Sequence, residues 1–400
     1  MVKIAVIIAE YNPFHNGHAY HIEQTRRMGA THVAVVMSGN FVQRGEPAFL
    51  EKRRRAEAAL RGGADLIVEL PLPFACAPAE RFARGAVALA DGLGCAELLS
   101  FGSECGDLEL LRHTAAVCDS PSFRQALKAE LAQGRSYAAA QQRALSALGE
   151  QDAAAVLERP NDTLALEYLR ALRTQGSRIR PVAVPRLFAE HDSPAPAVGS
   201  SFASASALRS MADTGMEQLS CYVPPAALSL YREAEACGEL PVPHRTDLVL
   251  LTLLRSLPEE AFSRLPDCSE GVENRLLRAR INALDTRGLL DSAKTRRYTH
   301  ARLRRLVLAA ALGIRREHTE GLPPYLRILG ANTRGTEILA AGRKDARLPI
   351  SHSLSRLEDM GGMIGETARL EARSTALYNL MLRIPRGSGT DYTDAAAWFR

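Results

Sequence analysis

The chain has 400 residues, of which 46% are apolar and 24% charged, and its formal net charge is +5. The length exceeds one ordinary domain, and the composition is that of a globular enzyme rather than a disordered or fibrous protein. The first residues become acidic too early for a signal peptide, and no apolar run reaches the length of a membrane span.

Strands and helices alternate over the first hundred residues. Runs rich in Val, Ile and Leu predict strands at 2–9, 32–37, 65–70 and 97–101, and helical patterns between them predict helices at 18–28, 51–61 and 80–91. Because these strands are apolar throughout, they predict a parallel sheet covered on both faces. The predicted fold class is therefore α/β and Rossmann-like.

The turn after the first strand carries two histidines three residues apart. It reads Glu10-Tyr-Asn-Pro-Phe-His15-Asn-Gly17-His18-Ala-Tyr-His21. A helix start offers unpaired N–H groups and a positive dipole end, and the carboxyl end of the first strand is where α/β sheets bind nucleotides. Gly17 would let a phosphate approach the backbone closely. We therefore predict that His15 and His18 stabilise charge on the α-phosphoryl group of ATP.

The alternative for these histidines is a surface turn or half of a metal site. A zinc site needs a third ligand and usually the helical H-E-x-x-H context, which this turn does not have. We predict no metal ligand here.

The loop after the second strand leaves the same edge of the sheet. It reads Ser38-Gly-Asn40-Phe-Val-Gln-Arg44-Gly-Glu-Pro, and its alternative interpretation is an ordinary turn. We expect Asn40 or Arg44 to orient a small carboxylate or a nucleobase. The cationic run that follows, 52–55, is interpreted as solvated surface, with an RNA contact by one or two of its members as the alternative.

Alanine- and leucine-rich helices follow over 107–175, and Asp107 and Asn161 are their predicted N-caps. The string Phe-Gly102-Ser-Glu ends the fourth strand, where the glycine would let adenine or ribose pack on the backbone. A further strand is predicted at 179–184 and is followed by Arg186 and Leu187.

The string Ser204-Ala-Ser206-Ala-Leu-Arg209 opens another short helix. By itself it is equally a capped helix start. Two hydroxyls and a guanidinium at a helix N-terminus would also hold a pyrophosphate.

Prolines over 222–244 predict a connection between two domains. Leucine recurs at helical spacing at 247–258, 274–290 and 301–313, which predicts an all-helical C-terminal domain. The predicted division is a catalytic domain at 1–235 and a helical domain at 245–400, with a loose tail at 386–390.

The positive charge is concentrated in one segment. Residues 270–316 contain twelve Lys or Arg against four Asp or Glu, which predicts a polyanionic partner. With Tyr298 and His300 as possible stacking groups, this composition suits RNA. The predicted RNA contacts are Arg275, Lys294, Arg296, Arg297, Tyr298, Arg302, Arg304 and Arg305.

The histidine turn resembles the His-x-Gly-His motif of the nucleotidyltransferase superfamily. Its longer string is similar to that of the bacterial tRNA(Met) cytidine acetate ligases, whose Phe-Gly-Ser-Glu, Pro-Asn-Asp and strand-end Arg elements occur here in the same order. Ser204, Ser206 and Arg209 resemble the superfamily element that holds the outgoing phosphates. The resemblance implies an ATP site made of Ile7, Ile8, Ala9, Glu10, Tyr11, Asn12, Pro13, Phe14, Asn16, Gly17, Ala19, Tyr20, Gly102, Asn161, Arg186 and Leu187.

This resemblance also implies a two-step reaction. Acetate attacks the α-phosphate of ATP, which arrives with Mg²⁺, and the acetyl-adenylate then acylates N4 of the wobble cytidine in elongator tRNA(Met). The alternatives are an adenylyltransferase for a small phosphorylated cofactor precursor and a non-catalytic RNA-binding protein. The seven cysteines form no C-x-x-C pair, so we expect a reduced, cytoplasmic setting without disulfides. The sequence leaves the oligomeric state open.

Overall fold

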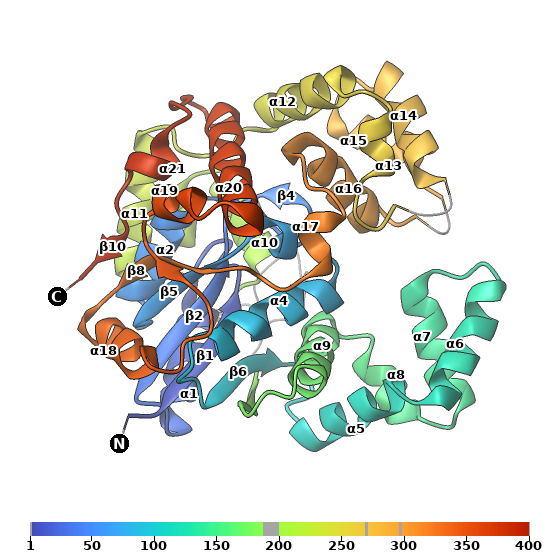
Figure 1. Cartoon of the computed structure of the whole chain (residues 1–400), viewed down its shortest axis with the longest axis horizontal. Coiled ribbons are helices and arrows are strands. Elements are labelled where there is room, and N and C mark those ends of the chain that lie inside the picture. The colour runs from blue at the N-terminus through green and yellow to red at the C-terminus, as the bar shows by residue number, and fades with distance from the viewer. Residues whose placement is uncertain (1, 187–199, 269–270, 296–297, 400) are drawn as a thin grey trace.

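A computed structural model describes residues 2–186, 200–268, 271–295 and 298–399 (Figure 1). Its centre is a sheet in the order β10-β8-β5-β2-β1-β6-β7, with β9 added beside β8. The strands predicted in the first half are β1 (Ile4–Ala9), β2 (His32–Ser38), β5 (Leu66–Leu70), β6 (Leu98–Ser103) and β7 (Arg180–Pro185), and all five pair in parallel. The predicted α/β class with a parallel sheet is confirmed.

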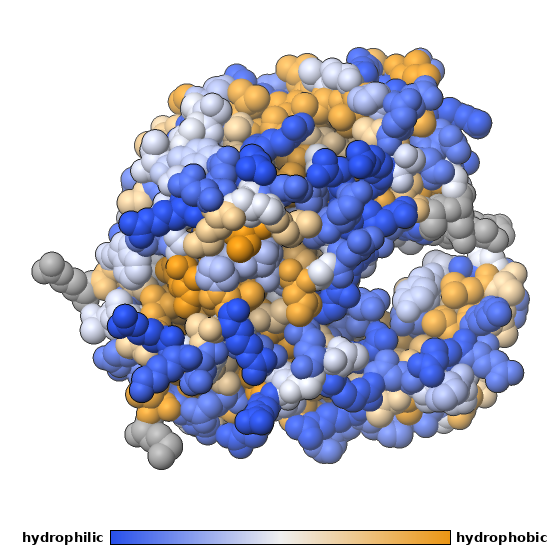
Figure 2. All heavy atoms as spheres, viewed as in Figure 1, coloured by the Kyte–Doolittle hydropathy of each residue, from blue (hydrophilic) through white to orange (hydrophobic). Residues whose placement is uncertain are grey.

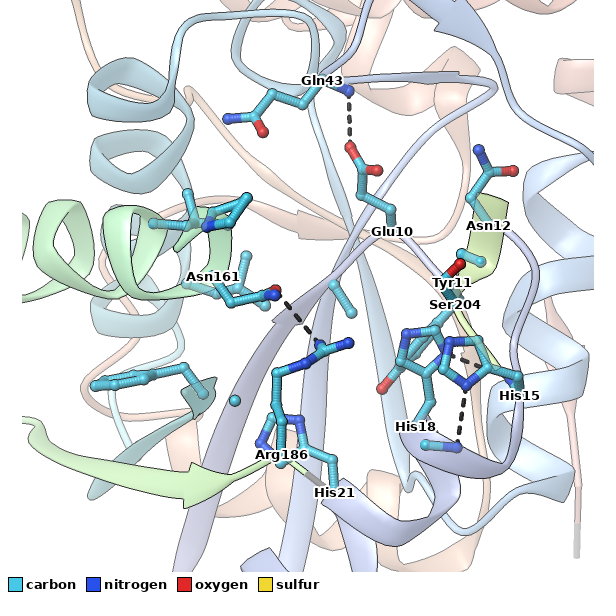
Figure 3. Close-up of a pocket in the computed structure, with 18 of the residues that line it drawn as sticks. Glu10, Tyr11, Asn12, His15, His18, His21, Gln43, Asn161, Arg186 and Ser204 are labelled. Carbon is cyan, nitrogen blue, oxygen red and sulfur yellow. Dashed lines mark hydrogen bonds between the residues drawn. The ribbon is translucent and has the colours of Figure 1, made fainter. Parts of the chain in front are cut away.

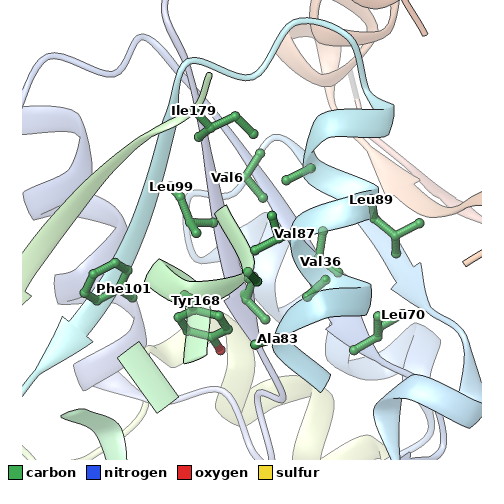
Figure 4. Packing of buried hydrophobic residues seen from close by; sticks show 14 of the residues in the cluster. Val6, Val36, Leu70, Ala83, Val87, Leu89, Leu99, Phe101, Tyr168 and Ile179 are labelled. Atoms are coloured by element: carbon green, nitrogen blue, oxygen red, sulfur yellow. The ribbon is translucent and has the colours of Figure 1, made fainter. Parts of the chain in front are cut away.

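Helices cover both faces of the sheet because alternate strand residues on each face are apolar. Ile4, Val6 and Ile8 of β1 pack with α4 (Ala79–Gly92) and α9 (Pro160–Thr174), as Figure 4 shows for Val6. On the other face, Ile7 packs with α1 (Asn16–Arg27), α2 (Lys52–Arg61), α10 (Ala205–Ala212) and the 3₁₀ turn η1 (Met216–Leu219). The carboxyl end of β1 is therefore held between two cores.

Helices α5 (Leu108–Cys118), α6 (Pro121–Ala132), α7 (Tyr137–Ala147) and α8 (Gln151–Val156) form an arm with a small core of its own. Asp107 is the N-cap of α5, as predicted, and accepts from the backbone N–H groups of Glu109 and Leu110. The prediction that Asn161 caps α9 is wrong. Pro160 takes the first helical position, which suits proline, so the cap falls on Arg159.

The predicted connection at 222–244 contains a helix, α11 (Pro225–Ala236), which packs on α2. Pro224 and Pro225 stand at the N-cap and first helical positions, where proline starts a helix rather than breaking one. The hydroxyl of Tyr231 on this helix donates to the carbonyl of Phe14 at 2.6 Å. The segment therefore supports the histidine turn.

The helical region comprises α12 (Pro243–Ser256), α13 (Glu260–Ser263), α14 (Val272–Asn282), α15 (Thr286–Ala293), α16 (His300–Leu312) and α17 (Glu317–Glu320). The predicted helix at 274–290 is two helices, since Asp285 caps α15 and accepts from Gly288 N at 2.6 Å. This region has its own apolar core. None of the described helices is long and apolar enough to cross a membrane.

The prediction that everything after residue 245 is helical needs correction. Strand β8 (Leu326–Ala331) enters the main sheet antiparallel to β5, and β9 (Ile350–Ser351) and β10 (Ala397–Trp398) pair with β8. The buried Arg327, second residue of β8, interrupts the apolar pattern by which the sequence would predict a strand. Around these strands lie α18 (Thr333–Gly342), α19 (Leu354–Asp359), α20 (Gly362–Met381) and α21 (Thr390–Thr393).

The tail is not loose as predicted. The side-chain amide of Asn379 donates to the carbonyl of Gly387 at 2.7 Å and to the hydroxyl of Thr390 at 2.8 Å. Asp391 is 2% exposed. No local sequence pattern indicates these pairings.

Candidate active site

A cavity of about 360 Å³ opens at the carboxyl ends of β1, β6 and β7 (Figure 3). Its walls come from the β1–α1 turn, the hairpin of β3 (Phe41–Val42) and β4 (Glu46–Pro47), and the first turns of α9 and α10. All of the sequence elements proposed for nucleotide binding therefore meet at one place.

His15 and His18 form a capping box at the start of α1. Nδ1 of His15 accepts from the backbone N–H of Gly17 at 3.0 Å, and Nδ1 of His18 accepts from the backbone N–H of His15 at 3.2 Å. The two rings stack with their centroids 3.8 Å apart. Because both Nδ1 atoms are acceptors, we assign the ring protons to Nε2, which leaves each ring one N–H donor.

Burial keeps both rings uncharged. It lowers the pKa of His15 to about 3, with a further contribution from the Arg186 guanidinium. Burial, His15, Arg186 and His21 together hold the pKa of His18 well below its usual range. At neutral pH the pair therefore offers positioned N–H groups, and positive charge must come from arginines.

Arg209 and Arg186 supply that charge from two sides of the cavity. Nη1 of Arg209 donates to the carbonyl of Asn12 at 2.7 Å, which ties α10 to the histidine turn. Ser204 is the N-cap of α10, and its Oγ lies 3.0 Å from Oγ of Ser206. Both serines and Arg209 line the cavity with the histidines.

The predicted ATP stretch divides into a lining and a support. Ile8, Ala9, Glu10, Tyr11, Asn12, Gly17 and Tyr20 line the cavity with the two histidines. Ile7 and Phe14 pack in the core on the other face, and the Asn16 amide donates to the carbonyls of Ser201 and Cys221. Pro13 and Ala19 also lie outside the lining. These five residues lie outside the cavity lining and support the turn.

Gly102, Asn161 and Arg186 form the opposite wall. The Glu104 carboxylate accepts from the Asn161 side-chain amide at 2.5 Å, and the Asn161 carbonyl oxygen accepts from Arg186 at 3.4 Å. Asp162 in turn accepts from the backbone N–H of Glu104 at 2.8 Å. The Phe-Gly-Ser-Glu and Pro-Asn-Asp strings thus clamp each other and orient Asn161. The predicted Leu187 lies outside the described residues.

The glycine at 102 is not needed for packing. A Cβ there would stand 3.5 Å from Cγ of Arg186, an ordinary contact, with nothing closer. The bare backbone at this wall is therefore available to a ligand.

The loop after β2 places only one of its two predicted residues at the site. Arg44 lines the cavity, together with Gln43 and Glu46. Asn40 is fully buried; its amide donates to Thr375 Oγ1 at 3.1 Å and its carbonyl oxygen accepts from Lys52 N at 2.8 Å. Its predicted substrate role is wrong, because these bonds turn the side chain into the protein to hold the loop.

The cationic run 52–55 is likewise not solvated surface. Lys52 and Arg55 are fully buried. Arg55 donates from Nη1 to the carbonyl of Glu10 at 2.5 Å, and also to the carbonyls of Gly39 and Leu50. Arg53 and Arg54 form ion pairs with Asp391 and Glu239. The run fixes the two loops that border the cavity.

His21 is not among the residues predicted from the sequence, although its imidazole also lines the cavity. Its Nε2 lies 3.0 Å from Ser100 Oγ, and burial lowers its pKa to about 4. The available signal was its position three residues after His18, on the same helix face. Among the described residues, no group of three His, Cys, Asp or Glu is arranged to hold a metal ion.

The HIGH Nucleotidyl Transferase family matches residues 2–391 of the chain. The tRNA(Met) cytidine acetate ligase of Syntrophotalea carbinolica is 39% identical over 94% of this chain and 93% of the relative, and that of Acetivibrio thermocellus is 34% identical over 98% and 99%. The chain belongs to the tRNA(Met) cytidine acetate ligase family. The resemblance carried by the histidine turn is confirmed.

A solved member of the family gives the same fold. The crystal structure of Thermotoga maritima TmcAL bound with alpha-thio ATP superposes with a TM-score of 0.91, at 32% identity and with 100% of both chains covered. Its apo form gives 0.92. The fold drawn in Figure 1 is thus that of an ATP-binding member of the family.

The helical region that contains the basic segment 270–316 lies beside a cleft. Figure 2 shows the surface hollowed between the helical region and helices α6 and α7, with hydrophilic residues on both walls. Arg304 reaches from α16 to the cavity loop, 3.1 Å from the Glu46 carboxylate, and burial lowers the pKa of Arg305 to about 10. The helical region and the cavity mouth are therefore in contact.

The residues predicted to contact RNA lie in different environments. Tyr298 is only 5% exposed, and the Arg302 guanidinium lies 5.2 Å from its ring centroid, so the ring is not an exposed stacking platform. Arg275 donates to the carbonyl of Ala293, and Lys294 ends α15. Arg296 and Arg297 lie outside the described residues.

Proposed function

We propose that this protein is an ATP-dependent acetate ligase that modifies tRNA in the cytoplasm. It activates acetate as acetyl-adenylate and transfers the acetyl group to N4 of the wobble cytidine of elongator tRNA(Met). The observation that carries the proposal is the pair of neutral imidazoles at the start of α1, facing a cavity with Arg186 and Arg209. The family membership supplies the substrates.

In the first step, an acetate oxygen bonds to the α-phosphorus of ATP while the bond to the β-phosphate oxygen breaks. The Nε2–H groups of His15 and His18 stabilise the α-phosphoryl oxygens. Ser204, Ser206 and Arg209 hold the departing pyrophosphate. Adenosine lies against Gly102, Asn161 and Arg186.

Magnesium belongs to this step as a partner of the triphosphate. Mg²⁺ typically binds through substrate phosphates, waters and one or two carboxylates rather than a protein cage. That preference fits a cavity in which no described group of three His, Cys, Asp or Glu is arranged as a metal cage, so the substrate phosphates and water would hold the ion. When bound, the ion would neutralise charge on the leaving pyrophosphate.

In the second step, the helical region presents the anticodon loop to the cavity. The contact between Arg304 and Glu46 supports this path because it joins α16 to the hairpin at the cavity mouth. Single-stranded loop bases are what proteins read in RNA, which suits a wobble position.

The test is incubation with ATP, radiolabelled acetate and bulk tRNA, followed by nucleoside analysis. We expect label in N4-acetylcytidine, with release of pyrophosphate and AMP that depends on acetate. Pyrophosphate release that requires a phosphorylated acceptor instead would indicate an adenylyltransferase. RNA binding without pyrophosphate release would indicate a non-catalytic protein.

A further inference from the structure

Glu10 is a carboxylate built into the cavity wall at the end of β1 (Figure 3). Its Oε1 accepts from the backbone N–H of Gln43 at 2.7 Å, and its own carbonyl accepts from Nη1 of Arg55 at 2.5 Å. Side chain and main chain are therefore both held. A group fixed in this way can be aimed at a substrate.

The second carboxylate oxygen of Glu10 is still available. In the part of the chain that the structure describes, Oε2 accepts no hydrogen bond. The other acidic residue of the lining, Glu46, is paired with Arg304 at 3.1 Å. Glu10 thus provides an anchored acceptor atom in the cavity.

Glu10 lies beside the hairpin that contacts the helical region. Its partner Gln43 belongs to the hairpin turn, whose neighbours Arg44 and Glu46 touch α16 through Arg304. Arg186 and His21 lie at the other end in Figure 3. The carboxylate therefore stands between the phosphate-binding turn and the helical region.

We propose, on the basis of the acetate ligase function above, that Glu10 is the general base of acetyl transfer. The N4 amine forms a bond to the acetyl carbon, the bond from that carbon to the adenylate oxygen breaks, and AMP leaves with the electron pair. The proton lost from N4 goes to Oε2 of Glu10 and then to solvent. An exocyclic amine conjugated to its ring is a weak nucleophile, so removal of this proton lowers the barrier.

The charges around Glu10 suit this role. Burial raises the pKa of Glu10, while the Gln43 N–H and the guanidinium groups of Arg55, Arg44 and Arg209 lower it. The Tyr168 hydroxyl and the Cys76 thiol also interact electrostatically with this carboxylate. Burial raises the pKa of both groups and keeps them protonated. A carboxylate with a raised pKa is a stronger base than a solvated one.

The test separates the two half-reactions in Glu10→Gln, which keeps the shape and the hydrogen bond from Gln43. Acetate-dependent exchange of pyrophosphate into ATP should stay within about threefold of wild type, whereas single-turnover acetyl transfer to tRNA should fall by about 10²- to 10⁴-fold. The acidic limb of the transfer pH profile should disappear. Glu10→Asp should transfer at an intermediate rate.

Hydroxylamine supplies a second readout, because it traps acetyl-adenylate without needing a base. The Glu10→Gln variant should form acetohydroxamate at the wild-type rate. Exchange or hydroxamate formation lost together with transfer would overturn the proposal in favour of a role in ATP or Mg²⁺ binding. Unchanged transfer would also overturn it. Failure of the proposed function is distinct, since the wild-type protein itself would then show no acetate-dependent exchange.

Discussion

Two groups of buried ionisable side chains border the loop between β2 and α2, and they are organised in opposite ways. In the cavity, His15, His18 and His21 are kept uncharged by burial. Behind the loop, Lys52 and Arg327 pair with Glu69 and Asp391 at 2.7 to 2.9 Å, and all four are essentially unexposed. We call this second group the ion cluster.

The difference indicates that the histidine group binds a ligand and that the ion cluster stabilises the fold. Lys52 and Arg327 face Glu69 and Asp391 in the ion cluster, and Asp391 also accepts from Arg53 at 3.0 Å and from the Thr375 hydroxyl at 2.9 Å. Burial and the neighbouring Glu69 raise the pKa of Glu371. Buried charges persist only when paired, so the ion cluster has no capacity left for a ligand. The cavity residues instead direct donors into open space.

The largest expected effect is a loss of activity when a histidine of the cavity is replaced. His18→Ala removes one Nε2–H donor, so acetate-dependent pyrophosphate exchange should fall by on the order of 10³-fold. Binding of tRNA should stay near the wild-type level. His113→Ala, at an exposed histidine of the arm, is the matched control and should exchange normally. Wild-type exchange by His18→Ala would remove the active-site assignment.

The ion cluster should respond in stability instead. Asp391→Asn leaves Lys52 and Arg327 short of a carboxylate, so the free energy of unfolding in urea should fall by about 3 to 5 kcal/mol. Exchange activity of the folded variant should be nearly unchanged. Asp394→Asn breaks a partly exposed pair with Arg386 and should cost less than about 1 kcal/mol. Equal losses in the two variants would contradict the cluster's role.

The same contrast explains what the sequence could and could not predict. The histidine turn could be predicted because its functional residues lie within twelve consecutive positions after an apolar strand. The ion cluster joins Lys52 to Asp391, 339 positions apart, and no local pattern records such a pairing. For that reason the sequence predictions of a solvated run at 52–55 and of a loose tail are both wrong.

The C-terminal strands were missed for a related reason. Strand β8 contains a buried arginine that is neutralised by Glu69 and Asp391 from elsewhere in the chain. Asn40 shows the same limit at the site, since its position in a loop suggested a substrate while its partners Thr375 and Lys52 are structural. Tertiary pairing decides these roles.

The neutral histidines also predict how stability depends on pH. Since the folded pKa of His15 is about 3, the unfolded chain binds more protons below pH 6.5, and stability should fall as the pH drops from 6.5. His15→Asn keeps an N-cap acceptor but does not titrate. Its loss of unfolding free energy between pH 7 and pH 5 should be smaller than wild type by on the order of 2 kcal/mol. An identical pH dependence would mean that His15 is charged in the folded protein.

The basic region should affect RNA binding alone. Reversing the charge of Arg296 and Arg297 to Glu should weaken tRNA binding by about tenfold at low salt, and the effect should shrink as salt rises. ATP affinity should not change. The double reversal of Arg343 and Lys344, which are exposed beside α18, changes the net charge equally and should leave tRNA affinity unchanged. An equal loss of tRNA affinity in both double variants would mean that net charge alone causes the effect.

The smallest effect expected is at the adenosine wall. Gly102→Ala should fold normally, because its Cβ meets only ordinary contacts, and should raise KM for ATP by about threefold to tenfold. Gly106→Ala is a useful contrast, since Gly106 has φ +67°. That variant should lose about 1 kcal/mol of stability and keep its KM. An unchanged KM in Gly102→Ala would place adenosine elsewhere.

A crystal structure of this protein with a non-hydrolysable ATP analogue tests the central assignment most directly. We expect the α-phosphate within hydrogen-bonding distance of Nε2 of His15 or His18, with the outer phosphates at the start of α10. An analogue bound elsewhere, with these imidazoles facing solvent, would contradict it.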